Sequence, residues 1–245
     1  MRIPRVYHLG KLNTGTDVAL SETASQHVQR VLRLRPGAEL RLFNGEGGEF
    51  EAVIINAERG RAQVKIGAHH ARDVESPLPI TLAQGISRGE RMDLTLQKSV
   101  ELGVAAIAPV VTSFCQVKLD GERMERRHQH WEGVITAACE QCGRTRLPLL
   151  HEKQSLMEWL AQHAEEGMLR IVLDHRATQG LSSLSKRPRA VILLVGPEGG
   201  LEESEIDAAR QAGYLPLSLG PRVLRTETAG LTALAALQTL WGDLG

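Results

Sequence analysis

From residue 80 to the end of the chain, short apolar segments alternate with segments of helical periodicity. Strands that are apolar throughout and separated by helices are typical of a parallel sheet with helices on both faces. In such sheets ligands bind at the carboxyl ends of the strands. The expected strands are ITLAQGIS (80–87), VAAIAPVV (104–111), MLRIVLD (168–174), AVILLV (190–195) and YLPLSL (214–219).

Helices are expected between these strands. Gly103 and Gly213 are suited to end two of them, because glycine adopts the left-handed conformation that closes a helix. Ser155 and Glu158 have the spacing of a capping box, which marks the start of another. The last helix carries an apolar stripe that is chiefly core. The expected helices are 91–103, 122–142, one starting at Ser155, 203–212 and 226–241.

The first seventy or so residues follow a different pattern. Three β-prone segments (38–43, 49–56 and 61–67) are separated by NGEGG and AERG turns, and a helix is expected over 22–33. Alternation with Asn-Gly and Gly-Gly turns indicates a small antiparallel sheet or barrel. The segment ARDVESPLP (71–79) interrupts the pattern with two prolines, so it is the expected domain boundary.

Charge is distributed unevenly along the chain. Lys and Arg balance Asp and Glu at 29 each, which alone argues against a nucleic-acid partner. Residues 1–75 hold 11 basic against 9 acidic residues, 76–154 hold 10 against 9, and 155–245 hold 8 against 11. Contacts with a polyanion are therefore expected in the first two thirds.

Several classes of protein are disfavoured. The start MRIPRVYHLG has no apolar signal segment, and the run AVILLV is too short to span a bilayer, so we expect a cytosolic protein without a membrane partner. Three cysteines, Cys115, Cys139 and Cys142, do not suit a disulfide framework. The CxxC pair lacks a second pair or a suitably spaced His, so small buried residues near a helix end are expected and no metal site.

Two glycine-rich segments, GPEGG (196–200) and LGPR (219–222), follow apolar strands at the same sheet edge. Neither has the spacing of a P-loop or of a dinucleotide fingerprint. Glu198 would repel a phosphate, so a neutral or cationic ligand suits the pair better. The simpler alternative is that both are tight strand-to-helix turns, although two loops rich in backbone donors at one edge favour a binding site.

Longer motifs carry a resemblance to a known family. VGPEGGLEESE, LSLGPRVLRTETA, RGERMDLTLQKSVELGV followed by IAPV, ACEQCGR with Pro148, and HVQRVLRLRPGAELRLFNG together resemble the bacterial RsmE family, over nearly the whole chain. The resemblance implies an enzyme that uses S-adenosylmethionine to methylate N3 of a uridine in the decoding region of 16S ribosomal RNA. It also implies an N-terminal PUA-like RNA-binding β-barrel (1–74) and an α/β domain of the SPOUT superfamily with a C-terminal trefoil knot (75–245).

The same resemblance implies how the cofactor is held. Backbone groups of GPEGG and LSLGPRVL would surround the adenine and the methionine part, and the end of IVLDH (171–175) would form a third wall. The implied cofactor-binding residues are Leu173, Gly196, Pro197, Glu198, Gly199, Gly200, Leu217, Leu219, Gly220 and Leu224.

Methylation of uridine N3 requires loss of the imide proton and stabilisation of the charge that spreads onto O2 and O4. Arg222 and Arg225 suit the second task, because a guanidinium stays charged and holds two acceptors. Glu198 and Glu227 are the candidates to take the proton or to hold an arginine. Alternatively, Arg225 and Glu227 form a solvated ion pair, and Glu198 is a carboxylate that favours a helix N-terminus.

Cations suited to RNA phosphates occur in two groups, although each residue could instead be a solvated surface charge. The predicted RNA-binding residues are Arg2, Arg5, Arg30, Arg33, Arg35, Arg88, Arg91 and Lys98.

The resemblance further implies a homodimer acting on 16S ribosomal RNA in the small subunit. The alternatives are a non-catalytic RNA-binding assembly factor and a SPOUT ribose 2′-O-methyltransferase. A Rossmann methyltransferase is disfavoured, because this sequence lacks the required glycine loop.

Overall fold

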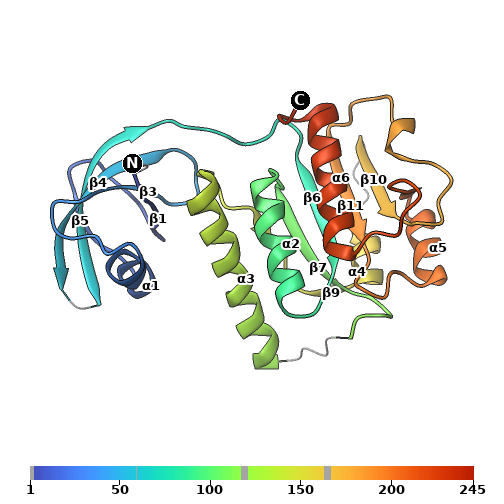
Figure 1. Cartoon of the computed structure of the whole chain (residues 1–245), viewed down its shortest axis with the longest axis horizontal. Coiled ribbons are helices and arrows are strands. Elements are labelled where there is room, and N and C mark those ends of the chain that lie inside the picture. The colour runs from blue at the N-terminus through green and yellow to red at the C-terminus, as the bar shows by residue number, and fades with distance from the viewer. Residues whose placement is uncertain (1–2, 59, 117–120, 163–166) are drawn as a thin grey trace. The chain divides into compact units, whose positions relative to one another are not determined.

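The computed structural model describes residues 3–58, 60–116, 121–162 and 167–245, and the chain divides into two units (Figure 1). Unit 1 comprises Met1–Glu75 and Thr136–Leu147, and unit 2 comprises Ser76–Ile135 and Pro148–Gly245. The first division lies within the proline-containing segment 71–79. In the described ranges, no helix combines the length and apolar character needed to cross a membrane.

Unit 1 contains a five-stranded sheet in the order β1-β3-β4-β5-β2. The pairs β3–β4, β4–β5 and β2–β5 are antiparallel, while β1 lies parallel to β3. Alternate residues of β4 and β5 face a core that includes Leu42, Ile54 and Val64. The strands are β1 (Arg5–Tyr7), β2 (Asp17–Ala19), β3 (Glu39–Phe43), β4 (Glu49–Glu58) and β5 (Arg61–His70).

The helix expected over 22–33 is divided. The helix α1 (Glu22–Gln26) begins at Ser21, whose Oγ accepts a hydrogen bond from Ala24 N–H at 3.2 Å. It continues as the π-helix η1 (His27–Val31), in which Leu32 N–H reaches five residues back to the His27 carbonyl. Arg33 then adopts a φ of 54°, so the turn ends in a left-handed residue.

The division into units differs from the expected domain division at the long helix α3 (Gly121–Cys142), because residues from Thr136 onward pack with unit 1. Glu140 accepts a hydrogen bond from Tyr7 N–H at 2.9 Å, and Arg144 donates from Nε to Glu75 at 3.1 Å. These long-range contacts bind 136–147 to the N-terminal sheet, which local periodicity does not reveal.

Unit 2 is built on a seven-stranded parallel sheet, as the apolar strands predict. Six strands follow the order β12-β10-β11-β6-β7-β8, and β9 pairs with β7. Every pairing in this sheet is parallel. The strands are β6 (Ile80–Gly85), β7 (Ala106–Val111), β8 (Leu149–Leu150), β9 (Gln154–Ser155), β10 (Met168–Leu173), β11 (Ala190–Val195) and β12 (Leu215–Leu217).

Helices cover both faces of this sheet (Figure 1). On one face α2 (Glu90–Glu101) packs against α6 (Thr226–Trp241), and α6 also contacts β6 and β11. On the other face α4 (Leu156–Gln162) and α5 (Glu203–Gln211) enclose an apolar cluster that includes Trp159 and Ile192. The short 3-10 helix η2 (Leu181–Ser183) lies between β10 and β11 in the chain.

Three helix boundaries follow the capping rules on which they were predicted. Ser155 Oγ accepts from Glu158 N–H at 3.2 Å, while Glu158 accepts from Ser155 N–H at 2.9 Å, so the capping box begins α4. Gly103 and Gly213 adopt φ values of 78° and 81° after α2 and α5. The knot implied by the resemblance stays a prediction.

Candidate functional site

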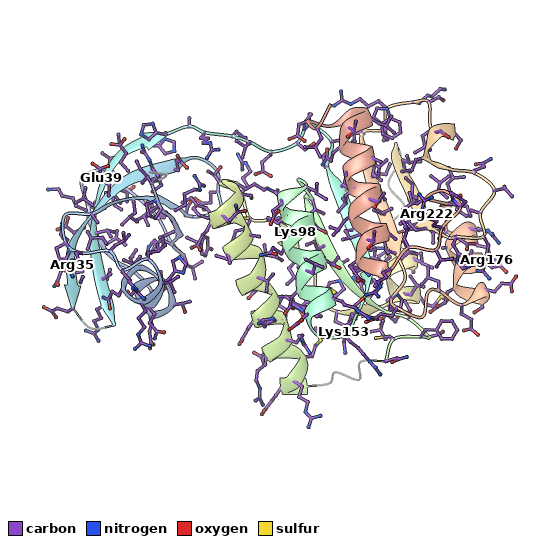
Figure 2. The ribbon with its side chains drawn as sticks, in the orientation of Figure 1. Arg35, Glu39, Lys98, Lys153, Arg176 and Arg222 are labelled. Atoms are coloured by element: carbon purple, nitrogen blue, oxygen red, sulfur yellow. The ribbon has the colours of Figure 1, made fainter. Side chains whose placement is uncertain are left out.

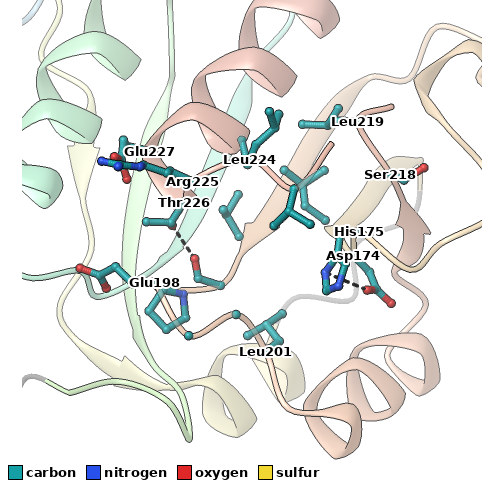
Figure 3. A pocket seen from close by; sticks show the side chains of 18 of the residues that line it. Asp174, His175, Glu198, Leu201, Ser218, Leu219, Leu224, Arg225, Thr226 and Glu227 are labelled. Carbon is teal, nitrogen blue, oxygen red and sulfur yellow. Dashed lines mark hydrogen bonds and ion pairs between the residues drawn. The ribbon is translucent and has the colours of Figure 1, made fainter. Parts of the chain in front are cut away.

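A cavity of about 440 Å³ lies at the carboxyl ends of β10, β11 and β12, the edge that the strand pattern predicts (Figure 3). Its size is that of a pocket for a small organic ligand, about 300–1,000 Å³. Three segments form most of its lining: the end of β10, the GPEGG loop (196–200), and the arginine loop (218–225) with the first turn of α6. Arg91 and Ile206 also line it. The lining includes the expected residues Leu173, Gly196, Pro197, Glu198, Gly199, Gly200, Leu217, Leu219 and Leu224.

The remaining expected cofactor residue, Gly220, does not line the cavity. Its φ of 79° turns the arginine loop between the lining residues Leu219 and Arg222. Its contribution is therefore to the path of the backbone, since L side chains rarely adopt this conformation.

The GPEGG loop is tightly folded. Gly200 N–H donates to the Pro197 carbonyl at 2.9 Å. A Cβ on Gly196 would lie 2.7 Å from the carbonyl carbon of Gly200, and a Cβ on Gly85 would lie 2.5 Å from Pro197. The loop thus needs glycine both within itself and at the end of β6, because backbone atoms approach too closely for a side chain.

Glu198, in the same loop, has its charge paired. Its Oε1 accepts from Arg88 N–H at 2.9 Å and lies 3.3 Å from Nη1 of Arg91. Burial raises the pKa of Glu198, but hydrogen bonds from these N–H groups and from its own N–H outweigh burial and hold the pKa below its ordinary value. Glu198 is therefore ionised at neutral pH and anchors the segment that begins α2.

The arginine loop presents its charges differently. Arg222 and Arg225 both line the cavity and are exposed, and neither is within ion-pair distance of a carboxylate in the described part of the chain. Arg225 occupies the N-cap position of α6, with its φ and ψ at −66° and 155°. The expected alternative, an ion pair between Arg225 and Glu227, is not present among the described contacts.

Glu227 lies in the first turn of α6 and is only 9% exposed. Its Oε2 has no hydrogen-bond partner among the described residues, although the side chain lines the cavity. In Figure 3, Arg225 and Glu227 lie on one side of the cavity, and Asp174 and His175 lie on the other. A buried carboxylate oxygen without a partner costs about 1–3 kcal/mol, so the site favours a ligand that supplies a donor or a positive charge.

The third wall lies at the end of IVLDH (171–175), as the resemblance implies, but the sequence prediction named only Leu173 there as a cofactor-binding residue. Asp174, His175 and Arg176 follow β10 and also line the cavity, so the prediction missed the charged side chains of this wall. Asp174 is 5% exposed and accepts from the N–H and Nε of Arg176, both at 3.0 Å. Burial raises the pKa of Asp174, yet these bonds outweigh it and lower the pKa. The position directly after an apolar strand was the available signal.

Thr226 was also missed, and it joins two of the walls. Its Oγ1 donates to the Gly196 carbonyl at 2.6 Å, the dashed line at the left of the cavity in Figure 3. The sequence shows Thr226 only as the start of a helix, where threonine is an ordinary residue. Only the paired positions of β11 and α6 in space reveal the contact.

The predicted RNA-binding cations of unit 1 divide into two kinds. Arg30, Arg33 and Arg35 are exposed, and Arg35 is labelled in Figure 2. Arg5 differs from the expectation, because it is 8% exposed, pairs with Glu49 and lies over the Phe43 ring at 5.0 Å. Its charge stabilises the interior of unit 1, where an RNA phosphate does not reach. Arg2 lies outside the described residues.

Two of the predicted cations of unit 2 lie at the start of α2, and the third, Lys98, lies in its last turn. Arg88 is exposed, and its N–H binds Glu198. Arg91 lines the cavity as well as pairing with Glu198, so it is closer to the cofactor residues than the sequence suggested. Lys98, labelled in Figure 2, pairs with Glu101 at 2.8 Å.

The cysteine pair lies at the end of α3, as expected for packing residues. Cys139 is buried and Cys142 half-buried. Burial raises the pKa of Cys139 to about 12, which keeps this thiol protonated at neutral pH. In the described ranges, no three His, Cys, Asp or Glu side chains gather as a metal site.

Residues 74–238, which contain the parallel sheet and its cavity, match the family described as RNA methyltransferase domain. Residues 20–67 match the RNA methyltransferase PUA domain. The chain is therefore of the class of RNA methyltransferases with a PUA domain.

The particular family follows from relatives over the full length. The ribosomal RNA small subunit methyltransferase E of Buchnera aphidicola is 35% identical over 243 residues, covering 99% of this chain and 98% of its own. A putative methyltransferase of Legionella pneumophila is 44% identical with a TM-score of 0.96, and the methyltransferase E of Neisseria gonorrhoeae is 40% identical with a TM-score of 0.92. Each of these two similarities covers 100% of this chain and 100% of the chain in the solved structure. The chain belongs to the ribosomal RNA small subunit methyltransferase E family.

Proposed function

We propose that this protein transfers a methyl group from S-adenosylmethionine to N3 of a uridine in 16S ribosomal RNA of the small ribosomal subunit. The observation that supports S-adenosylmethionine as the cofactor is the cavity itself. The Legionella and Neisseria structures, similar over their full lengths, are each described with S-adenosylmethionine bound. The assignment of uridine N3 as the methylated atom rests on the resemblance of the motifs and on the charges that line the cavity.

The residues present fit this cofactor. Leu173, Leu217 and Leu219 provide apolar surface for an adenine ring, and the glycine loops offer backbone groups for its polar edge. The unpartnered Oε2 of Glu227 suits a cavity that receives a cation. When bound, S-adenosylmethionine supplies an electrophilic methyl group on a positively charged sulfur.

The arrangement favours Glu227 over Glu198 as the group that takes the N3 proton. The Oε1 of Glu198 is engaged with Arg88 and Arg91, and these contacts help to lower the pKa of Glu198, which makes it a weaker base. Glu227 has an oxygen without a partner and lies beside Arg225 at the start of α6. Glu227 would accept the proton, while Arg225 and Arg222 would stabilise the charge on uracil O4 and O2.

The exposed Arg30, Arg33 and Arg35 of unit 1 and Arg88 of unit 2 are proposed to bind RNA phosphates. We also propose a homodimer, on the resemblance to SPOUT proteins, and a cytoplasmic location, because the substrate is ribosomal RNA. Sedimentation of the purified protein at micromolar concentration tests the dimer.

The activity is tested by incubating the purified protein with small subunits, or with free 16S RNA, and isotopically labelled S-adenosylmethionine. Mass spectrometry of the digested nucleosides should find the label in 3-methyluridine. Label in a 2′-O-methylated nucleoside would support a ribose methyltransferase instead. Cofactor binding without labelled RNA from either substrate would favour an assembly factor.

A further inference from the structure

Gln84 is a buried polar side chain at the end of β6 that lies outside the lining of the cavity. It is 0% exposed and is paired in the sheet register with Val195 of β11 and Pro109 of β7. These neighbours place it beneath the point where the GPEGG loop leaves the sheet. A polar residue in the middle of an apolar sheet is unusual, so its contacts indicate what it does.

The amide of Gln84 joins three segments of unit 2. Its Nε2 lies 3.0 Å from the Gly85 carbonyl, 3.0 Å from Thr226 Oγ1 and 3.4 Å from the Gly196 carbonyl. Thr226 Oγ1 in turn donates to the Gly196 carbonyl at 2.6 Å. The end of β6, the GPEGG loop and the first turn of α6 are thus connected by two side chains.

The stability of the fold does not explain why a glutamine occupies position 84. Gln84 Oε1 is buried and has no hydrogen-bond partner among the described residues, and it faces the Cα of Gly230, where an added Cβ would lie 3.5 Å away. An unsatisfied buried acceptor destabilises a fold, whereas an apolar side chain of similar volume would avoid this penalty. Features that break a local rule tend to occur at functional sites.

We propose that Gln84 and Thr226 are positioning residues that fix the two walls of the cavity relative to each other. The hydrogen bond from Thr226 fixes the turn of α6 that carries Arg225 and Glu227, and its acceptor, Gly196, begins the loop that holds the cofactor. Gln84 holds the Thr226 hydroxyl in the orientation that donates to Gly196. This inference rests on the proposed function for its effect on turnover, but its effect on cofactor affinity is independent of the RNA substrate.

The test compares the affinity for S-adenosylhomocysteine, measured by calorimetry, among variants of the full chain. We expect Thr226→Val to bind about tenfold more weakly, the loss of one to two buried hydrogen bonds. Thr226→Ser, which keeps the hydroxyl, should recover most of that affinity. Thr239→Val is the matched control, because Thr239 lies on the same helix, is exposed, and donates only to Ala235 within the helix.

Gln84→Met, similar in volume, should weaken binding by a comparable factor, and the double variant should be little weaker than either single one, because both changes remove one network. At saturating cofactor, kcat for RNA methylation should also fall in these variants. Affinities of Thr226→Val and Gln84→Met within twofold of wild type, or losses that multiply in the double variant, would overturn the proposal. If Thr226→Val does not fold, Gln84→Met and Thr226→Ser decide it. A wild-type protein that binds the cofactor analogue but methylates no RNA contradicts the proposed function and leaves the affinity comparison valid.

Discussion

The two loops that face the cavity differ in how their charges are balanced. In the GPEGG loop the single carboxylate, Glu198, is paired with Arg91 and with a backbone N–H. In the arginine loop and the turn that follows it, Arg222 and Arg225 lack ion-pair partners in the described part of the chain, and Glu227 has an unpartnered buried oxygen. The carboxylate of the first loop is paired without a ligand, whereas we expect ligands to supply the partners of the second.

This difference suggests that one loop holds the cofactor and that the other takes part in the reaction. A loop whose groups are already paired keeps one shape and serves as a preformed wall. Charges that are left unpaired in the free protein are available to a transition state, where they stabilise the charge that develops. The predictions below test that division, starting with the largest expected effect.

Replacing Glu227 by Gln should lower turnover about 10²–10⁴-fold if it accepts the N3 proton. The same change should alter the free energy of unfolding by at most about 1 kcal/mol, because the Gln amide is no better paired in this position and only the attraction to the helix N-terminus (about 0.3–1 kcal/mol) is lost. Single-turnover kinetics and urea denaturation measure the two effects. Turnover within a few fold of wild type would remove Glu227 from the chemistry.

Arg225→Ala should lower turnover about 10²–10³-fold, the effect of removing one group that stabilises transition-state charge. Its affinity for S-adenosylhomocysteine should change little, because we propose that the backbone of the loops holds the cofactor. Arg187→Ala is a suitable control, since Arg187 is also exposed in unit 2 and does not line the cavity. Equal losses in affinity and in turnover would assign Arg225 to cofactor binding instead.

Gly196→Ala tests the preformed wall. The new Cβ would lie 2.7 Å from a backbone atom of Gly200, so the loop must open, and we expect cofactor affinity to fall about tenfold or more. Gly133→Ala is the matched control, because a Cβ there meets nothing within 4 Å. The control should bind normally and gain about 0.5–1 kcal/mol of helix stability. Unchanged affinity for Gly196→Ala would mean that the loop adapts to its ligand.

Glu198→Gln should have the smallest effect, a loss in cofactor affinity of about three- to fivefold, typical of a partly exposed ion pair of up to about 1 kcal/mol. Because the pKa of Glu198 is lowered in the folded state, its contribution to the free energy of unfolding is complete above the ordinary carboxyl pKa. That contribution disappears as the pH falls through the lowered pKa. The free energies of unfolding of wild type and variant should therefore differ at neutral pH and converge in acid. A difference that grows on acidification would contradict this pairing.

Periodicity predicted five strands of the unit 2 sheet, the helices around them and the edge at which the cavity lies, but not the two-residue strands β8 and β9. It did not predict the strand order, because nothing in the local pattern says that β10 lies between β11 and β12. Residues that line the cavity through glycine-rich motifs were found. Asp174 was expected only as part of the segment IVLDH, and Thr226 was not singled out, since the roles of both side chains depend on their contacts in space. Arg5 shows the same limit, because burial of an arginine depends on a partner 44 residues away.

The passage of α3 from unit 2 into unit 1 limits how this chain can be divided. The ion pair between Glu75 and Arg144 joins positions separated by 69 residues, and the intervening chain belongs largely to the other unit. A fragment that ends at residue 75 would leave Glu75 and the backbone of Tyr7 without their partners. The RNA-binding module is therefore not transferable by a single crossover in the gene, and grafting it onto another enzyme requires three junctions: after residue 75, before residue 136 and after residue 147.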